Sequence, residues 1–286
     1  MLDCILTGED LAHGALDALA PVACAKRAQH RPGAIRLGGI EEAAREAILT
    51  RAADFSSLNV MLVPERLSVA DIRFIAFDMD GTLVVNECID DMARLGGREK
   101  EVAALTAQAM AGKADFAESL RSRVAALKGL ASDAIDAAVR AIELQPGAKY
   151  LLDFCARYGM RTAILSGGFP EFTSRVADTL GIDYCVSNEL VRDALGALTG
   201  EVTGPAGGKL FDADGKRRAL EVLAQTQGLP LSATMAVGDG ANDVQMLAAA
   251  GLSVAYHAKP VAISAASCAI RTGGLDTIAL LFAESW

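Results

Sequence analysis

Residues 72–82 read IRFIAFDMDGT, and this stretch decides the fold. Its first half, Ile72–Phe77, is apolar except for one arginine and stops abruptly at Asp78. Such runs are typical of strands that are buried on both faces of a parallel sheet. Two similar runs, Thr162–Leu165 and Thr234–Val237, follow later in the chain, and each ends in a polar, glycine-rich turn. The pattern predicts three strands of one α/β core.

Helical patterns lie between these strands, and the alternation predicts a parallel sheet with right-handed crossover connections. Ligands of such sheets bind at the carboxyl ends of the strands. The turns Ser166-Gly167-Gly168 and Gly238-Asp239-Gly240, and the aspartates after Phe77, all fall at that edge. A site is therefore expected there. The clearest helical patterns of this core are Lys149–Tyr158, Pro170–Leu180 and Arg217–Gln227.

The chain divides into two expected domains, residues 1–70 and residues 71–286. Residues 86–148 interrupt the second domain with helical patterns alone, which predicts a small helical cap over the carboxyl edge of the sheet. A further insert, Ser187–Thr203, has the pattern of a hairpin. The expected cap helices lie near Ile89–Leu95 and over Glu99–Met110, Asp115–Lys128 and Ser132–Ile142, with Asp115 and Ser132 as N-caps.

Residues 1–70 read as a small α+β unit. Short apolar runs at Cys4–Leu6 and Asn59–Val63 predict strands, and Glu41–Arg51 has helical spacing. Pro32 and the glycines Gly33, Gly38 and Gly39 predict turns in the stretch Gln29–Gly39. The unit has no cluster of titratable groups that suggests chemistry. It could be a regulatory or dimerisation module, which would make a homodimer, or it could be a packing appendage.

The composition of the 286 residues is that of a globular protein, with 52% hydrophobic and 22% charged residues. The net charge of −9 disfavours nucleic acid as a partner. No apolar run reaches the roughly 18–20 residues that a membrane span needs. The start, MLDCILTGED, does not resemble a secretory signal. Six scattered cysteines without a C-x-x-C pair argue against zinc or disulfides, and together these features predict a cytoplasmic protein.

Asp78 and Asp80 lie two residues apart at the end of a buried strand, so both side chains can enter one pocket. Two carboxylates this close repel each other unless a cation or a shared proton intervenes. Mg²⁺ prefers carboxylate oxygens together with phosphate and water, and it is the expected cofactor. The alternative is an ordinary polar β-turn.

Further polar groups come from the other strand ends. Asp239 and Asp243 add two carboxylates, although a simple turn with an Asp cap would look the same. Ser166 and the amides of the following glycines could bind phosphate at the start of a helix. Lys216 opens another helix and, taken alone, reads as a surface lysine. These residues are expected at the same edge of the sheet as Asp78 and Asp80, and this shared position favours a single site over unrelated turns.

These segments, in this order, resemble the haloacid dehalogenase-like hydrolases, and within them the phosphoserine phosphatase family. The resemblance covers roughly residues 72–286. It implies a Rossmann-like parallel sheet core with a helical cap inserted after the first core strand. Gly81 departs from that family, which commonly has serine there. The stretches that carry the resemblance are DMDGTLVVNECIDD (78–91), AMAGKADFAESLRSRVAALKG (109–129), LSGGF (165–169), GDGANDVQML (238–247) and AYHAKP (255–260).

The resemblance implies roles in the hydrolysis of a phosphate monoester. Asp78 would be the nucleophile that forms an aspartyl-phosphate, and Asp80 the acid and base. Mg²⁺ would be held by Asp78, the Asp80 backbone carbonyl and Asp239. The phosphate ligands would be Lys216, Ser166, Gly167 and Gly168, with Asn242 near them and Asp243 orienting Lys216 or a metal-bound water.

The same resemblance implies that the substrate is phosphoserine, which carries an ammonium and a carboxylate beside its phosphate. Glu87 would bind the ammonium group and Arg123 the carboxylate, while Met110 and Phe116 would form an apolar wall. Without the resemblance, Glu87 and Arg123 would be interpreted as solvated charged residues of helices, and Phe116 as a core residue of the helical bundle.

Two other functions stay open. A binding or regulatory protein could keep the fold without turnover, although the intact Asp78/Asp80 pair argues against this. A phosphatase or phosphotransferase could also act on another small phosphomonoester. The Glu87/Arg123 pair disfavours sugar phosphates, which lack the two charges of an amino acid.

Overall fold

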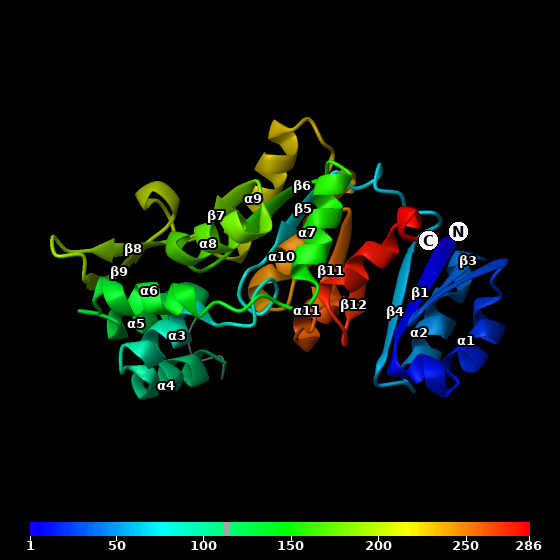
Figure 1. Cartoon of the computed structure of the whole chain (residues 1–286), viewed down its shortest axis with the longest axis horizontal. Coiled ribbons are helices and arrows are strands. Elements are labelled where there is room, and N and C mark those ends of the chain that lie inside the picture. The colour runs from blue at the N-terminus through cyan, green and yellow to red at the C-terminus, as the bar shows by residue number, and fades with distance from the viewer. Residues whose placement is uncertain (111–114) are drawn as a thin grey trace.

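The computed structural model describes residues 1–110 and 115–286, without the side chains of residues 109 and 110. Its centre is a six-stranded sheet in the order β12-β11-β10-β5-β6-β7, and every pair in it is parallel (Figure 1). This confirms the expected parallel α/β core. Its strands are β5 (Phe74–Phe77), β6 (Arg161–Leu165), β7 (Tyr184–Val186), β10 (Thr234–Gly238), β11 (Leu252–Tyr256) and β12 (Cys268–Ile270).

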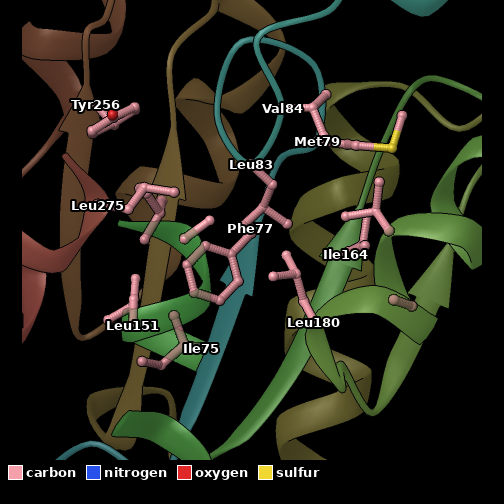
Figure 2. Packing of buried hydrophobic residues seen from close by; sticks show 14 of the residues in the cluster. Ile75, Phe77, Met79, Leu83, Val84, Leu151, Ile164, Leu180, Tyr256 and Leu275 are labelled. Atoms are coloured by element: carbon pink, nitrogen blue, oxygen red, sulfur yellow. The ribbon is translucent and has the colours of Figure 1, made fainter. Parts of the chain in front are cut away.

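The sheet is buried on both faces, which explains its nearly continuous apolar runs. Ile75 and Phe77 point to one face, against α7 (Ala148–Arg157) and α8 (Pro170–Leu180) (Figure 2). Phe74 and Ala76 point to the other. That second face is covered by α9 (Ala213–Thr226), α10 (Val244–Ala249) and α11 (Pro260–Ala265).

The strand order fixes where the site lies. From β5 the chain runs outward through β6 and β7, and it then returns to the opposite side of β5 through β10, β11 and β12. Crevices form outside the carboxyl ends of the strands at such a switch point. The turns after β5, β6 and β10 therefore converge there.

The described residues of the cap form four helices, which lie at one end of the core (Figure 1). Its two connections to the core pair with each other, since Val84 bridges to Leu144 in antiparallel fashion. Asp115 is the N-cap of the third helix and accepts a hydrogen bond from the Glu118 amide, as expected. The helices are α3 (Cys88–Leu95), α4 (Glu99–Met110), α5 (Phe116–Ala126) and α6 (Ser132–Arg140).

The expected hairpin forms from β8 (Glu189–Arg192) and β9 (Leu198–Thr203), and it is attached to the cap. Leu198 exchanges backbone hydrogen bonds with Gly129 and Leu130, next to the end of α5. Ser132 was expected to be an N-cap, and this is wrong because its hydroxyl donates instead to the Gly196 carbonyl in the hairpin. The hairpin is thus a third link between core and cap.

Residues 2–64 form a four-stranded antiparallel sheet in the order β2-β3-β1-β4, with α1 and α2 on one face. The order of elements, βαββαβ, is that of a ferredoxin-like unit. The expected turns at residues 29–39 are correct only in part, because Gly38 and Gly39 lie inside a strand. A Cβ at Gly38 would lie 2.7 Å from the Arg27 guanidinium, and Gly39 has φ +72° at an irregularity in the strand pairing. The elements are β1 (Leu2–Gly8), α1 (Ala15–Ala23), β2 (Arg27–Arg31), β3 (Ala34–Ile40), α2 (Arg45–Ala52) and β4 (Leu58–Pro64).

The second face of this sheet packs on the core. Ile5, Met61 and Val63 are fully buried in the same apolar cluster as Phe77. Asn59 joins the two sheets, because its side chain accepts hydrogen bonds from the amides of residues 271 and 272 and donates to the Thr272 carbonyl at 2.8 Å. The small sheet is therefore covered on both sides.

Candidate active site

Asp78 and Asp80 follow β5, and both carboxylates lie close enough to Lys216 and Asp239 to feel their charges, while Met79 between them is buried in the core. This is the period-2 alternation of an extended chain. The Asp78 Oδ1 atom accepts hydrogen bonds from the Met79 amide at 2.7 Å and contacts Lys216 Nζ at 2.8 Å. Among the described residues, the one hydrogen bond of the Asp78 Oδ2 atom is a long one from Asn242 Nδ2, at 3.4 Å. Oδ2 is thus the less restrained oxygen.

Lys216 is not a surface residue, because only 1% of it is exposed. Its Nζ atom bridges Asp78 and Asp243, at 2.8 and 2.7 Å. Burial alone would lower the pKa of Lys216, but the two carboxylates outweigh it and hold the pKa above its ordinary value. Lys216 is therefore a permanent cation in the floor of the site.

Asp243 is fully buried and uses both of its carboxylate oxygens within the protein. Oδ1 binds Lys216, and Oδ2 accepts hydrogen bonds from the amides of Asp239 and Gly240 at 3.0 and 2.9 Å. These contacts fix the loop after β10. Asp243 thus holds both the Lys216 ammonium group and the backbone of this loop.

Three carboxylates gather at this point. One oxygen from each of Asp78, Asp239 and Asp243 lies within 4.8 Å of the others. Burial and the Asp243 charge raise the pKa of Asp78 well above its usual range despite Lys216, and the same two causes raise that of Asp239. One lysine does not balance this charge. Hard oxygen ligands with excess negative charge fit a divalent cation such as Mg²⁺.

The carboxylate of Asp80 lies apart from this cluster. Its Oδ1 atom accepts a hydrogen bond from the Cys88 thiol at 2.8 Å. Burial raises the pKa of Asp80 to about 6, with the Cys88 hydrogen bond and Lys216 opposing the shift. A carboxyl group in this range can both give and take a proton near neutral pH.

The turn after β6 forms a cradle of polar groups. Ser166 is buried, and its hydroxyl accepts a hydrogen bond from the Gly168 amide at 2.9 Å. Asn188 donates to the Gly167 carbonyl at 2.9 Å and so holds the turn in place. The Phe116 ring of the cap covers Gly167, since a Cβ added there would lie 2.9 Å from the ring. The cap is closed on this cradle.

Glu87 and Arg123 both lie in the cap. Glu87 is solvent-accessible and lies immediately before α3. Partial burial and the carboxylates of Asp80 and Asp239 raise the pKa of Glu87 to about 7. The buried Nε atom of Arg123 has no hydrogen-bond partner among the described residues. The Met110 side chain lies outside the described part of the chain.

Sequence reasoning missed three residues of the site. Thr82 donates to Asp239 Oδ1 at 3.2 Å, and its place inside the DMDGT stretch could have revealed it. Asn188 follows the short strand β7, and a polar residue after a strand was the available signal. Cys88 gave no signal, because a lone cysteine in a helix is usually a packing residue.

Comparison with known proteins agrees with this geometry. A family model for haloacid dehalogenase-like hydrolases matches residues 72–251. A phosphoserine phosphatase from Polaromonas sp. is 45% identical over 214 residues, which cover 74% of this chain and 90% of that protein. The chain belongs to the phosphoserine phosphatase family of these hydrolases. It is therefore a haloacid dehalogenase-like hydrolase, as the sequence resemblance implied.

Solved structures support the same fold for this hydrolase. A HAD family hydrolase from Salmonella enterica matches the whole of both chains with a TM-score of 0.87 at 26% identity. A substrate-bound phosphoserine phosphatase matches 74% of this chain and 98% of its own, with a TM-score of 0.68 at 37% identity. Among the described residues of the hydrolase, no helix combines the length and apolar character that a bilayer span requires.

Proposed function

We propose that the chain hydrolyses O-phospho-L-serine to L-serine and phosphate, the last step of serine biosynthesis. The observation that carries this proposal is the Asp78/Asp80 site under a cap in which Glu87 lies near enough to Asp80 and Asp239 for their charges to raise its pKa. Arg123 of α5 is the cation that we expect to complete the pair. Free phosphoserine has the complementary ammonium and carboxylate groups. The phosphoserine phosphatase from Polaromonas sp. and the substrate-bound structure support the same substrate.

The first step transfers the phosphoryl group to the protein. The Asp78 Oδ2 atom attacks phosphorus, and the bond from phosphorus to the serine oxygen breaks. Asp80 gives its proton to that oxygen, so serine leaves as an alcohol. Lys216, the Ser166 hydroxyl and the Gly167 amide bind the phosphoryl oxygens and stabilise the charge that develops there. The product on the protein is an aspartyl-phosphate.

The second step restores the nucleophile. Asp80, now ionised, takes a proton from water, and the water oxygen attacks phosphorus. The bond to Asp78 breaks and inorganic phosphate leaves. Asp78, Asp239 and the Asp80 backbone carbonyl would hold Mg²⁺, which offsets the repulsion between these carboxylates and the phosphate. Asn242, near Asp78, completes the phosphate site.

The test of this function is phosphate release from a panel of phosphomonoesters, each with Mg²⁺ and with a chelator. We expect the highest kcat/KM for phosphoserine and no turnover in excess chelator. A sugar phosphate or a simple alkyl phosphate that is turned over better would replace phosphoserine as the substrate. Full activity in the chelator would remove the metal from the reaction.

We expect Mg²⁺ to stabilise the protein more at pH 7.5 than at pH 5.5. The raised pKa values of Asp78, Asp80 and Asp239 mean that the metal-free folded state binds more protons than the unfolded state above pH ~4. The stability contributed by these groups therefore falls as the pH rises from ~4 towards neutrality. Saturating Mg²⁺ should raise the melting temperature by about 5 °C at pH 7.5.

Asp239→Asn serves as the control for this melting experiment, because it removes one expected metal ligand. The variant should lose most of the Mg²⁺-induced shift at pH 7.5. An equal shift in the variant and the wild type would place the cation elsewhere.

Residues 1–70 form a separate domain in this proposal, and they contain none of the proposed site residues. The buried face formed by Ile5, Met61 and Val63 favours a packing role, while a regulatory role and a homodimer remain further proposals. A cytoplasmic location is also proposed, on the basis of the six free cysteines.

We expect a fragment of residues 71–286 to keep the chemistry but to melt at a lower temperature, because its apolar surface becomes exposed. Circular dichroism and phosphoserine hydrolysis on the fragment and the full chain would check this. A folded, soluble fragment without any activity would show that the first domain contributes to the site.

A further inference from the structure

We propose that Cys88 is a positioning residue that ties the proton-transferring carboxyl group of Asp80 to the cap. This inference rests on the proposed hydrolysis, in which Asp80 first gives and then takes a proton. Cys88 is the first residue of α3, and therefore of the cap itself. The one side-chain hydrogen bond that its thiol makes within the described residues is to Asp80, so we expect its effect on the reaction to pass through that residue.

The contact is direct and enclosed. The Cys88 Sγ atom lies 2.8 Å from Asp80 Oδ1, and Cys88 is only 1% exposed. The sulfur is the donor and the Asp80 oxygen the acceptor, because an ionised carboxylate has no proton of its own to give. Leu83 and Met92 belong to the same buried cluster. The thiol therefore has a fixed place from which to donate.

The two oxygens of Asp80 face different partners. Oδ1 binds the Cys88 thiol, whereas Oδ2 faces the phosphate cradle, 3.7 Å from where a Cβ on Gly168 would stand. Without the thiol, the carboxyl group could rotate about its terminal torsion, which is intrinsically soft. The hydrogen bond from the cap thus selects the orientation that presents Oδ2 to the leaving group.

A thiol is a weak hydrogen-bond donor. It can orient the carboxyl group while leaving Oδ2 free to exchange its proton. The positioning should matter most when the leaving group needs that proton. The serine alkoxide needs it, whereas p-nitrophenolate is a stable anion and leaves without it.

The experiment compares kcat/KM for phosphoserine and p-nitrophenyl phosphate in three variants of Cys88. Cys88→Ala and Cys88→Val remove the donor, and the valine fills the space of the sulfur. Both should lose about 10-fold for phosphoserine and less than about 2-fold for the aryl ester. Cys88→Ser keeps a donor and should recover part of the loss. Cys155→Ala is the matched control, because Cys155 is an equally buried free thiol away from the site.

An equal fall for both substrates, or no fall in the alanine and valine variants, would overturn the positioning role. A serine variant no better than alanine would do the same. If Cys88→Ala alone fails to fold, the kcat/KM values of the Cys88→Val variant for the two substrates decide the question. If the wild type does not hydrolyse phosphoserine, the proposed function fails and the positioning role is tested separately. The alkyl phosphate of the panel with the highest kcat/KM is then compared with p-nitrophenyl phosphate in the same Cys88 variants.

Discussion

Asp78→Asn should abolish turnover, with a fall in kcat of at least about 10⁴-fold. The amide keeps the shape of the side chain but cannot act as the anionic nucleophile. The fold should survive, because Lys216 keeps Asp243 as a partner at 2.7 Å and the site loses one of its crowded negative charges. The measurement is steady-state phosphate release with phosphoserine and Mg²⁺, together with a melting curve of the purified variant.

Asp153→Asn is a suitable control for this loss. Asp153 is an exposed residue of α7 that pairs with Lys149, and its change should leave kcat as it is. Wild-type turnover by the Asp78→Asn variant would refute the aspartyl-phosphate route. A variant that has melted at the assay temperature would be measured again at a lower temperature.

Arg123→Ala should reduce kcat/KM for phosphoserine by roughly 30- to 1,000-fold. The change removes a charge-assisted contact with the substrate carboxylate and leaves the aspartate chemistry in place. A lost contact of this kind, with its partner left unpaired, costs about 2–4 kcal/mol. A generic ester such as p-nitrophenyl phosphate has no carboxylate and should be affected much less. The ratio of kcat/KM for the two substrates is therefore the measurement.

Two further variants complete the Arg123 experiment. Glu87→Gln should also affect phosphoserine more than the aryl ester, because it weakens the contact with the ammonium group. Arg121→Ala changes an exposed arginine two residues away on the same helix, α5, and should leave both substrates unchanged. If both substrates fall by one factor in the Arg123 and Glu87 variants, these residues do not recognise the amino-acid part of the substrate.

The core of the fold could be predicted because its sequence pattern is local. An apolar run such as Ile72–Phe77 is typical of a strand buried on both faces of a parallel sheet, and the polar residues that end such a strand lie at the carboxyl edge. The cap followed from helical spacing and capping residues, such as Asp115. The aspartates of the candidate site were found in the same way, since they directly follow strands.

What could not be predicted depends on contacts between distant parts of the chain. The strand that contains Gly38 and Gly39 looked like a turn, because the side chains that need the space, Arg27 among them, lie on neighbouring strands. Lys216 looked like a surface lysine, since its burial depends on Asp78 and Asp243 coming from other strand ends. The link from Cys88 to Asp80 likewise appears only when the cap lies on the core.

The three attachments of the cap bear on the size of molecule that the enzyme can admit. The paired connections at Val84 and Leu144 and the hairpin bound beside Gly129 attach the cap to the core, and the Phe116 ring covers Gly167. A phosphorylated serine inside a polypeptide would need two exits for its flanking chain. Its peptide bonds would also have removed the ammonium and carboxylate groups. On the proposed function, the enzyme would therefore act on the free amino-acid ester and spare phosphoproteins.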